Sequence, residues 1–217
     1  MDLTRLIEAA AAALGGAERL RTIRTYRAEA IRQPAGGGPA AELRVWRAAG
    51  GRIRVEETEP GAGSRAWVVD GDSGVLVSRA LPANPPRRFP LWAEDVAEIR
   101  REARLAPRNV LAHAHELDLA GGEAAHAPDG SPAVALELRP EGVRYYFHPQ
   151  SFLCVAMVDA ARDRRVEYAE YRKVGGVLTP FEERHAIVGR PSDAHAVEYD
   201  VVAYDEELPA DLFSLEA

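Results

Sequence analysis

The sequence is poor in the residues on which much covalent chemistry depends. Cys154 is the only cysteine, so an intramolecular disulfide is excluded, and its place in an apolar run favours a buried, inert thiol. Lys173 is the only lysine, and it lies among charged neighbours, whereas a Schiff-base lysine needs an apolar setting. Catalysis through a thiolate or an amine is therefore not indicated.

Long apolar runs are also missing. No stretch approaches the roughly 18 apolar residues that a membrane-spanning helix needs. Asp2, Arg5 and Glu8 interrupt the start of the chain, so no export signal is recognised there. We therefore expect no transmembrane segment and a cytoplasmic location for the chain as given, or a periplasmic location if a signal was removed upstream of Met1.

Several functional signatures are absent as well. The sequence has no serine-hydrolase elbow, phosphate loop, dinucleotide fingerprint or zinc-finger spacing. The glycine runs 36–38 and 121–122 lack the helix and lysine that a phosphate cradle would need. We expect no cofactor and no metal. The formal net charge of -7, with mixed charges between Arg87 and Arg108, gives no support for a nucleic-acid partner.

In most of the sequence, apolar and polar residues alternate with a period of two. Leu3, Leu6, Ile7, Ala10 and Leu14 recur at helical spacing, and a second helical pattern covers 91–105. Between and after these segments about ten short stretches alternate in polarity and are joined by hairpin-length turns. We expect a mostly β, α+β fold with a curved antiparallel sheet, in one domain spanning 1–217, with the proline-rich stretch 82–90 as a crossover.

The layout resembles the LolA/LolB-like superfamily of bacterial lipoprotein carriers. The resemblance rests on "AAAALGGAERLRTIRTYRAEA", "WVVDGDSGVLV", "YYFHPQSFLCVAMV", "YAEYRKVGGVLTPFEERH" and "DEELPADLFSL", which together cover nearly the whole chain. These motifs specify turns and strand ends and carry no chemistry. His148 stands where the family more often has Asp.

The resemblance implies an incomplete β-barrel of roughly eleven antiparallel strands, with helices closing its concave side over a hydrophobic cavity. Carriers of this superfamily hold lipoprotein acyl chains. The violacein-pathway enzyme VioE has the same fold and is a cytosolic catalyst without a cofactor. The chain as given lacks the signal peptide and lipobox cysteine of the carriers, which favours the comparison with VioE.

Aromatic side chains are the candidates for lining such a cavity. An aromatic ring with a polar tip suits a pocket for an amphipathic ligand, although plain core packing explains the same residues. The candidate cavity residues are Trp46, Trp67, Trp92, Tyr145, Phe147, Tyr168, Phe181 and Tyr199. We expect the three tryptophans to be buried.

Two groups of polar residues are candidates for chemistry. Glu183 and His185 share a strand face, so they can form a carboxylate–imidazole pair for acid/base catalysis, with Tyr145 and Tyr168 as further proton carriers; a local ion pair is the alternative. His113 and His115 lie two apart, so on a strand they would face one side and could chelate a metal, but no third ligand follows from the spacing.

Two main functions remain open at this point, and a structural module for protein contacts is a weaker third. The first is a carrier that holds an apolar small molecule, a lipid or an acyl chain in the cavity. The second is a cofactor-independent biosynthetic enzyme, a cyclase or isomerase, in which Glu183, His185, Tyr145 and Tyr168 would move protons in the same cavity. We favour the carrier.

Overall fold

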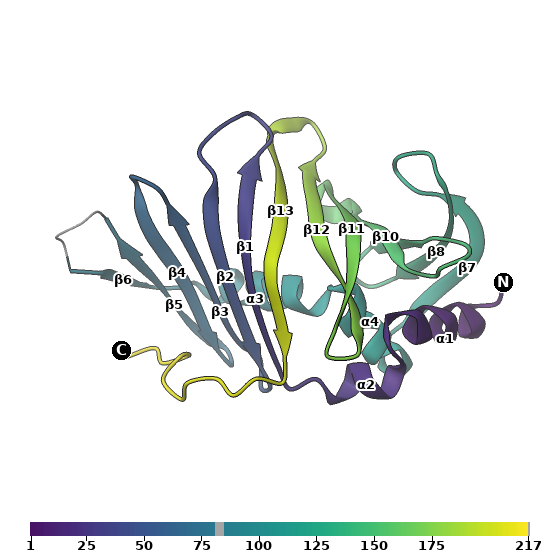
Figure 1. The fold of residues 1–217 in the computed structure, drawn as a ribbon, viewed down its shortest axis with the longest axis horizontal. Coiled ribbons are helices and arrows are strands. Elements are labelled where there is room, and N and C mark those ends of the chain that lie inside the picture. Colours follow the sequence, from purple (N-terminus) through teal and green to yellow (C-terminus); the bar gives the residue numbers. More distant parts are fainter. Residues whose placement is uncertain (81–84, 217) are drawn as a thin grey trace. The chain divides into compact units, whose positions relative to one another are not determined.

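The protein is described by a computed structural model that covers residues 1–80 and 85–216. The helices are α1 Leu3–Leu14, α2 Ala17–Thr22, α3 Ala93–Arg104 and α4 Pro107–Ala112, with short 3₁₀ turns at Ala114–Glu116 and Ala160–Arg162 (Figure 1). The strands are β1 Thr25–Pro34, β2 Ala41–Ala48, β3 Arg52–Glu59, β4 Gly63–Asp70, β5 Ser73–Arg79, β6 Arg87–Pro90, β7 Leu119–His126, β8 Pro132–Leu138, β9 Val143–Phe147, β10 Cys154–Asp159, β11 Arg164–Val174, β12 Val177–Ile187 and β13 Arg190–Tyr204.

The described strands form one sheet in which neighbouring strands are hydrogen-bonded, in the order β6-β5-β4-β3-β2-β1-β13-β12-β11-β10-β9-β8-β7. The pairs whose registers are determined are antiparallel, and β6 and β7 lie at the two ends of the order, so the sheet is not closed. A mostly β fold with an open antiparallel sheet and accompanying helices confirms the predicted fold class. No helix in the described part of the chain is long and apolar enough to cross a membrane.

The chain divides into two compact units. Unit 1 comprises Met1–Thr22, Pro34–Gly36 and Leu105–Val197, and unit 2 comprises Ile23–Gln33, Gly37–Arg104 and Glu198–Ala217. Unit 1 therefore contains β7 to β12 with α1, α2 and α4. Unit 2 contains β1 to β6 with α3. That the chain forms a single domain stays a prediction.

Helix α1 belongs to unit 1 and has clear sequence reasons for its ends. The Asp2 side chain accepts a hydrogen bond from the Arg5 backbone N–H at 2.9 Å, which caps the first turn. Gly15 has a φ of 127° and ends the helix. A Cβ at Gly15 would lie 2.4 Å from the Gly176 carbonyl oxygen, so glycine also permits close contact with the turn between β11 and β12.

Helix α3 packs on one face of the unit 2 sheet. Val96 of α3 forms a buried cluster with Ile53 of β3 and Val69 of β4, and Ile99 packs against it. On the other face of the same strands, Phe213 from the C-terminal segment packs on Val68 and Val75. The described C-terminal segment is irregular. In unit 2 both faces of the sheet are thus partly covered.

Three details of the prediction were wrong. The segment around His113 and His115, expected to be a strand, forms the end of α4 and a 3₁₀ turn, because Pro107 starts a second helix after α3. For the proline-rich stretch 82–90 the sequence predicts only a crossover. Its end forms the four-residue strand β6 at the edge of the sheet, where proline is tolerated; residues 81–84 lie outside the described part. The described strands number thirteen, whereas about ten were expected.

Candidate functional site

Unit 2 contains an extended apolar feature, a single row of side chains across six neighbouring strands, named here the apolar row. The strand registers place Ala28 opposite Val45, Val45 opposite Val55, and Val55 opposite Trp67. Trp67 in turn lies opposite Leu76, and Leu76 opposite Phe89. Directly opposed residues share a face of the sheet, so these six side chains form a continuous line. Five spacings of about 4.8 Å make it about 24 Å long.

The apolar row is only partly covered. Ala28 is buried, while Val45, Val55, Trp67 and Leu76 are partly buried. Phe89, at the edge strand, is 48% exposed. A continuous line of apolar side chains that keeps contact with solvent differs from a filled core, and it is the kind of surface that marks a binding site.

The two sides of the apolar row are different. On one side lies the row that α3 covers, with Ile53 and Val69, and Val55 of the apolar row packs against this cluster. On the other side lies a charged cluster, defined as Arg32, Glu57, Glu59 and Arg65. Apolar surface is therefore flanked by a helix on one side and by charged groups on the other, an arrangement suited to an amphiphile.

The charged cluster is held together by two guanidiniums and two carboxylates. Arg32 pairs with Glu57, and its Nη2 atom lies 3.8 Å from Oε1 of Glu59. Arg65 Nη2 lies 3.0 Å from Oε1 of Glu59 and 4.0 Å from Oε1 of Glu57. The Glu57 side chain is 7% exposed. Its charge can be buried because both arginines compensate it.

The predicted cavity residues of unit 2 do not all lie together. Trp67 belongs to the apolar row. Trp46 lies on the opposite face of the sheet, where it packs with Val68 and Phe213. Trp92 is 75% exposed at the start of α3, so the expectation that all three tryptophans are buried is wrong. Tyr199 lies on β13 and is partly buried.

The predicted cavity residues of unit 1 are almost completely buried. Tyr145 is 0% exposed, Phe147 1%, Phe181 8% and Tyr168 9%. The strand registers align Leu136, Tyr145, Met157, Val166 and His185 in one row across β8 to β12. The Tyr145 hydroxyl donates a hydrogen bond to the Leu105 carbonyl oxygen at 2.9 Å, just before α4.

The structure brings Glu183 and His185 together. His185 Nε2 lies 3.0 Å from Glu183 Oε2, and Arg164 Nη2 lies 3.3 Å from His185 Nδ1. Because an arginine N–H can only donate, Nδ1 accepts and the imidazole proton resides on Nε2, which donates to Glu183. The His195 ring stacks on His185 with centroids 4.7 Å apart. In this arrangement the lone pair that a general base needs is already engaged.

The phenol of Tyr168, proposed as a proton carrier, is held in its neutral form. Burial raises the pKa of Tyr168 well above its ordinary value of 10.0, and nearby Glu183 raises it further. Its hydroxyl lies 3.9 Å from the sulfur of Met157, and the Tyr145 hydroxyl is bonded to a backbone carbonyl. Glu183, His185 and Tyr145 are thus engaged by protein groups, whereas Tyr168 also lines a pocket of unit 1.

The histidine pair His113 and His115 is not placed for chelation. His115 Nε2 lies 3.3 Å from Oε1 of Glu116, and His113 Nδ1 lies 3.6 Å from Oε2 of the same residue. All three side chains are more than half exposed. Among the described residues no group of three or more histidine, cysteine or acidic side chains is arranged to hold a metal ion.

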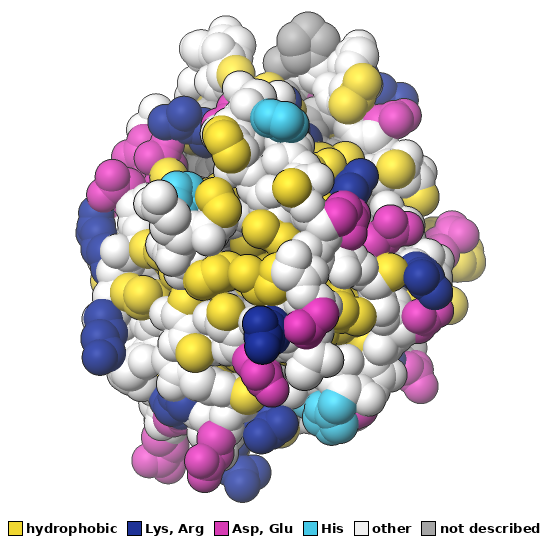
Figure 2. Space-filling view, turned by 90° about the vertical axis from the view of Figure 1, so that its right-hand side faces the viewer, with side chains coloured by type: hydrophobic (Ala, Val, Ile, Leu, Met, Phe, Trp, Pro, Cys, Tyr) yellow, Lys and Arg dark blue, Asp and Glu magenta, His cyan; other side chains and the backbone are white. Residues whose placement is uncertain are grey.

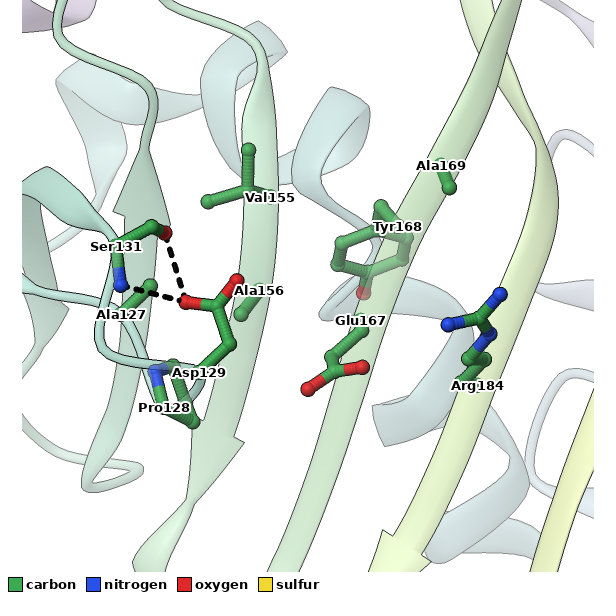
Figure 3. Close-up of a pocket in the computed structure, with 10 residues that line it drawn as sticks. All are labelled: Ala127, Pro128, Asp129, Ser131, Val155, Ala156, Glu167, Tyr168, Ala169 and Arg184. Carbon is green, nitrogen blue, oxygen red and sulfur yellow. Dashed lines mark hydrogen bonds between the residues drawn. The ribbon is translucent and has the colours of Figure 1, made fainter.

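A pocket of about 250 Å³ opens in unit 1 between the turn that joins β7 to β8 and the strands β10 to β12 (Figure 3). Tyr168, a predicted cavity residue, lines it together with Ala156, Asp129, Glu167 and Arg184. The Asp129 carboxylate accepts hydrogen bonds from the Ser131 backbone N–H at 2.9 Å and hydroxyl at 2.7 Å, and these bonds lower its pKa. The pocket is small and mixed in polarity, so it does not match the predicted apolar cavity.

A further apolar surface is visible on the side where β7 and α1 lie in Figure 1. Figure 2 shows apolar side chains gathered near the middle of this face, with charged side chains mainly toward its rim. In α1, Leu3 and Ile7 are only partly buried. No register or described pocket links these side chains into a line comparable with the apolar row.

Comparison with known proteins identifies the fold. No protein-family model matches the chain, and no curated protein matches its sequence. Among solved structures, a DUF1329 family protein from Desulfovibrio piger covers 100% of the chain and 99% of its own length, with a TM-score of 0.60 and 12% identity. A LolA superfamily protein from Nitrosomonas europaea covers 100% and 99%, with a TM-score of 0.58 and 12% identity.

A domain from Vibrio parahaemolyticus, described as an outer membrane lipoprotein-sorting protein domain, covers 97% of the chain and 95% of its own length, with a TM-score of 0.54 and 9% identity. At 9% to 12% identity such likeness concerns the fold and not the ligand. The resemblance drawn from the sequence motifs is confirmed at that level: the chain has the fold of LolA superfamily proteins.

Proposed function

We propose that the protein is a carrier that binds an amphiphile with a long apolar chain, such as a lipid or a lipoprotein acyl chain, on the apolar row of unit 2. The observation that carries the proposal is the row itself, six apolar residues aligned over about 24 Å and left partly exposed. An acyl chain spans about 15 Å, half of a bilayer core, so the row is long enough to hold one.

The fold supports the same proposal. Two structures with this fold are described as a LolA superfamily protein and as a lipoprotein-sorting domain. The enzyme alternative has less support, because the Tyr145 phenol and the imidazole that would move protons are engaged by protein groups. Binding of an apolar chain requires no such groups, only apolar surface that the ligand can cover.

The proposal is tested by isolating the protein and looking for a bound amphiphile. Native mass spectrometry of the protein from cells should show copurified lipid, and a delipidated sample should take up a fluorescent fatty acid. The variant Leu76→Asp places a charge in the apolar row, between Trp67 and Phe89, and should weaken uptake at least about tenfold. The control Thr58→Asp adds the same charge at an exposed position on the other face of the sheet and should leave uptake unchanged.

Two outcomes would contradict the proposal. A protein that is empty in mass spectrometry and takes up no fatty acid has no carrier function. Uptake that survives Leu76→Asp at full affinity would place the binding surface elsewhere. Circular dichroism and urea unfolding of both variants establish that each is folded before uptake is measured.

A further inference from the structure

We infer that the amphiphile bound on the apolar row carries an anionic head group, a carboxylate or a comparable acceptor oxygen, and that Arg32 and Arg65 bind it. This inference rests on the proposed function, since it names the chemical class of the ligand for the same surface. It follows from the charged cluster, which runs alongside the row within unit 2.

Arg32 has donor capacity that the described residues do not use. Its Nη2 atom faces Glu57 and Glu59, but its Nε–H is buried and has no acceptor among the described residues. A guanidinium presents five N–H donors, and a buried donor without an acceptor is costly. The Arg32 side chain is 30% exposed, so a ligand oxygen beside the charged cluster can contact it, and a turn of the guanidinium would bring its unused donor to that oxygen.

Arg65 lies where the apolar row meets the charged cluster. Its guanidinium carbon is 5.9 Å from the centroid of the Trp67 ring, so the charge is positioned next to the middle of the row. The Arg65 side chain is 48% exposed, whereas the side chains of Glu57 and Glu59 are 7% and 30% exposed. A head group that approaches the cluster therefore meets a guanidinium first.

The balance of charge along this side of the row favours an anion. The registers align Glu57, Arg65, Ser78 and Arg87 across β3 to β6 on the face that carries the row. Together with Arg32 and Glu59, three guanidiniums stand against two carboxylates. In a chain with a formal net charge of -7, this is a local surplus of positive charge beside an apolar surface.

The experiment compares three ligands with the same alkyl chain: dodecanoate, dodecanol and dodecylamine. Each is titrated against the delipidated full-length protein by displacement of a neutral fluorescent alkyl probe, at concentrations where the ligand is dissolved as a monomer. A charge-assisted hydrogen bond should make dodecanoate about tenfold tighter than dodecanol. Dodecylamine should bind more weakly than dodecanol, because its ammonium group is placed beside guanidiniums.

Matched variants test whether the two arginines cause the preference for dodecanoate over dodecanol. Arg65→Gln should weaken dodecanoate about tenfold and leave dodecanol unchanged. Arg79→Gln removes an exposed arginine on the other face of the sheet and should change neither ligand. Arg32→Gln is made together with Glu57→Gln, so that no buried carboxylate is left unpaired, and it should also reduce the preference for dodecanoate.

The outcomes separate this inference from the proposed function. If no ligand binds, both are wrong. If dodecanol binds as tightly as dodecanoate, or if Arg65→Gln weakens both equally, the head-group assignment is wrong while the carrier function stands. If dodecylamine binds tightest, Glu57 and Glu59 rather than the arginines set the preference, and the inference is overturned.

Discussion

The length of the apolar row determines how affinity should depend on the length of the ligand chain. A methylene fully removed from water contributes about 0.8 kcal/mol, and a chain lying on one face of a sheet has about half of its surface covered. We therefore expect about 0.4 kcal/mol for each methylene, which is about a twofold change in Kd. From octanoate to dodecanoate, four methylenes should lower Kd about 15-fold.

The same reasoning predicts the chain length at which affinity stops rising. The complete row is about 24 Å long, so affinity should keep rising to hexadecanoate. In Leu76→Asp the uninterrupted part, from Ala28 to Trp67, spans three spacings, or about 14 Å. The affinity of this variant should no longer rise with chain length for the longer ligands, whereas Thr58→Asp should keep the chain-length dependence of the unchanged protein.

The assay is displacement of a fluorescent fatty acid at constant pH and salt, with isothermal titration calorimetry as a second method. The heat-capacity change of binding should become more negative as the chain lengthens, because more apolar surface is removed from water. An affinity that is flat between octanoate and hexadecanoate would refute the reasoning, as would an unchanged chain-length dependence in Leu76→Asp.

Three further predictions concern stability. Tyr145→Phe removes a buried hydrogen bond of 2.9 Å and should lower the free energy of unfolding by about 1–2 kcal/mol in urea titrations. Gly15→Ala, at a φ of 127° with a backbone oxygen 2.4 Å from the added Cβ, should cost more than 2 kcal/mol, and Gly16→Ala, with φ 98° and nothing within 4 Å, about 1 kcal/mol; equal losses would contradict the contact argument. Burial raises the pKa of the Tyr168 and Tyr171 phenols well above 10.0, so above about pH 10 only the unfolded chain releases these protons. Stability should then fall as pH rises, by up to about 1.4 kcal/mol per pH unit for each phenol, and a stability that is flat to pH 11 in urea unfolding would be inconsistent with buried phenols.

Local features of the fold could be predicted because short-range chemistry determines them. Gly50 and Gly51 form the turn between β2 and β3 with φ values of 79° and 76°, which glycine adopts without strain. Gly175 and Gly176 do the same between β11 and β12, with φ values of 53° and 88°. The pairing of these strands follows from the turns, and the overall layout follows from the pairing.

The position of the candidate site was harder to predict. The alternation within β2 correctly separates Val45 from Trp46, but it does not say which face is the more open one. That depends on α3, which covers Ile53 and Val69, and on the C-terminal segment, which covers Val68. Both coverings are long-range contacts, and for this reason Trp46 and Trp67 were grouped together although they lie on opposite faces.

The charged cluster was missed for a related reason. In the sequence, Arg32, Glu57 and Arg65 are alternating charges on separate strands, which is typical of solvent-facing positions. Only the strand registers bring them together beside the apolar row. The glycine turns fix the registers of β2 to β4. The alignment of Val45, Val55 and Trp67 can then be counted from the sequence, so the apolar row could have been predicted from the turn positions.

Fluorescence quenching in single-tryptophan variants tests the central claim most directly. The variant Trp46→Phe/Trp92→Phe keeps only Trp67 on the apolar row, and Trp67→Phe/Trp92→Phe keeps only Trp46 on the opposite face. A saturating fatty acid with bromine on its alkyl chain quenches indoles that it contacts. We predict strong quenching of Trp67 and little quenching of Trp46. Quenching of Trp46 with Trp67 unaffected, or of neither, would contradict the claim that the apolar row holds the ligand.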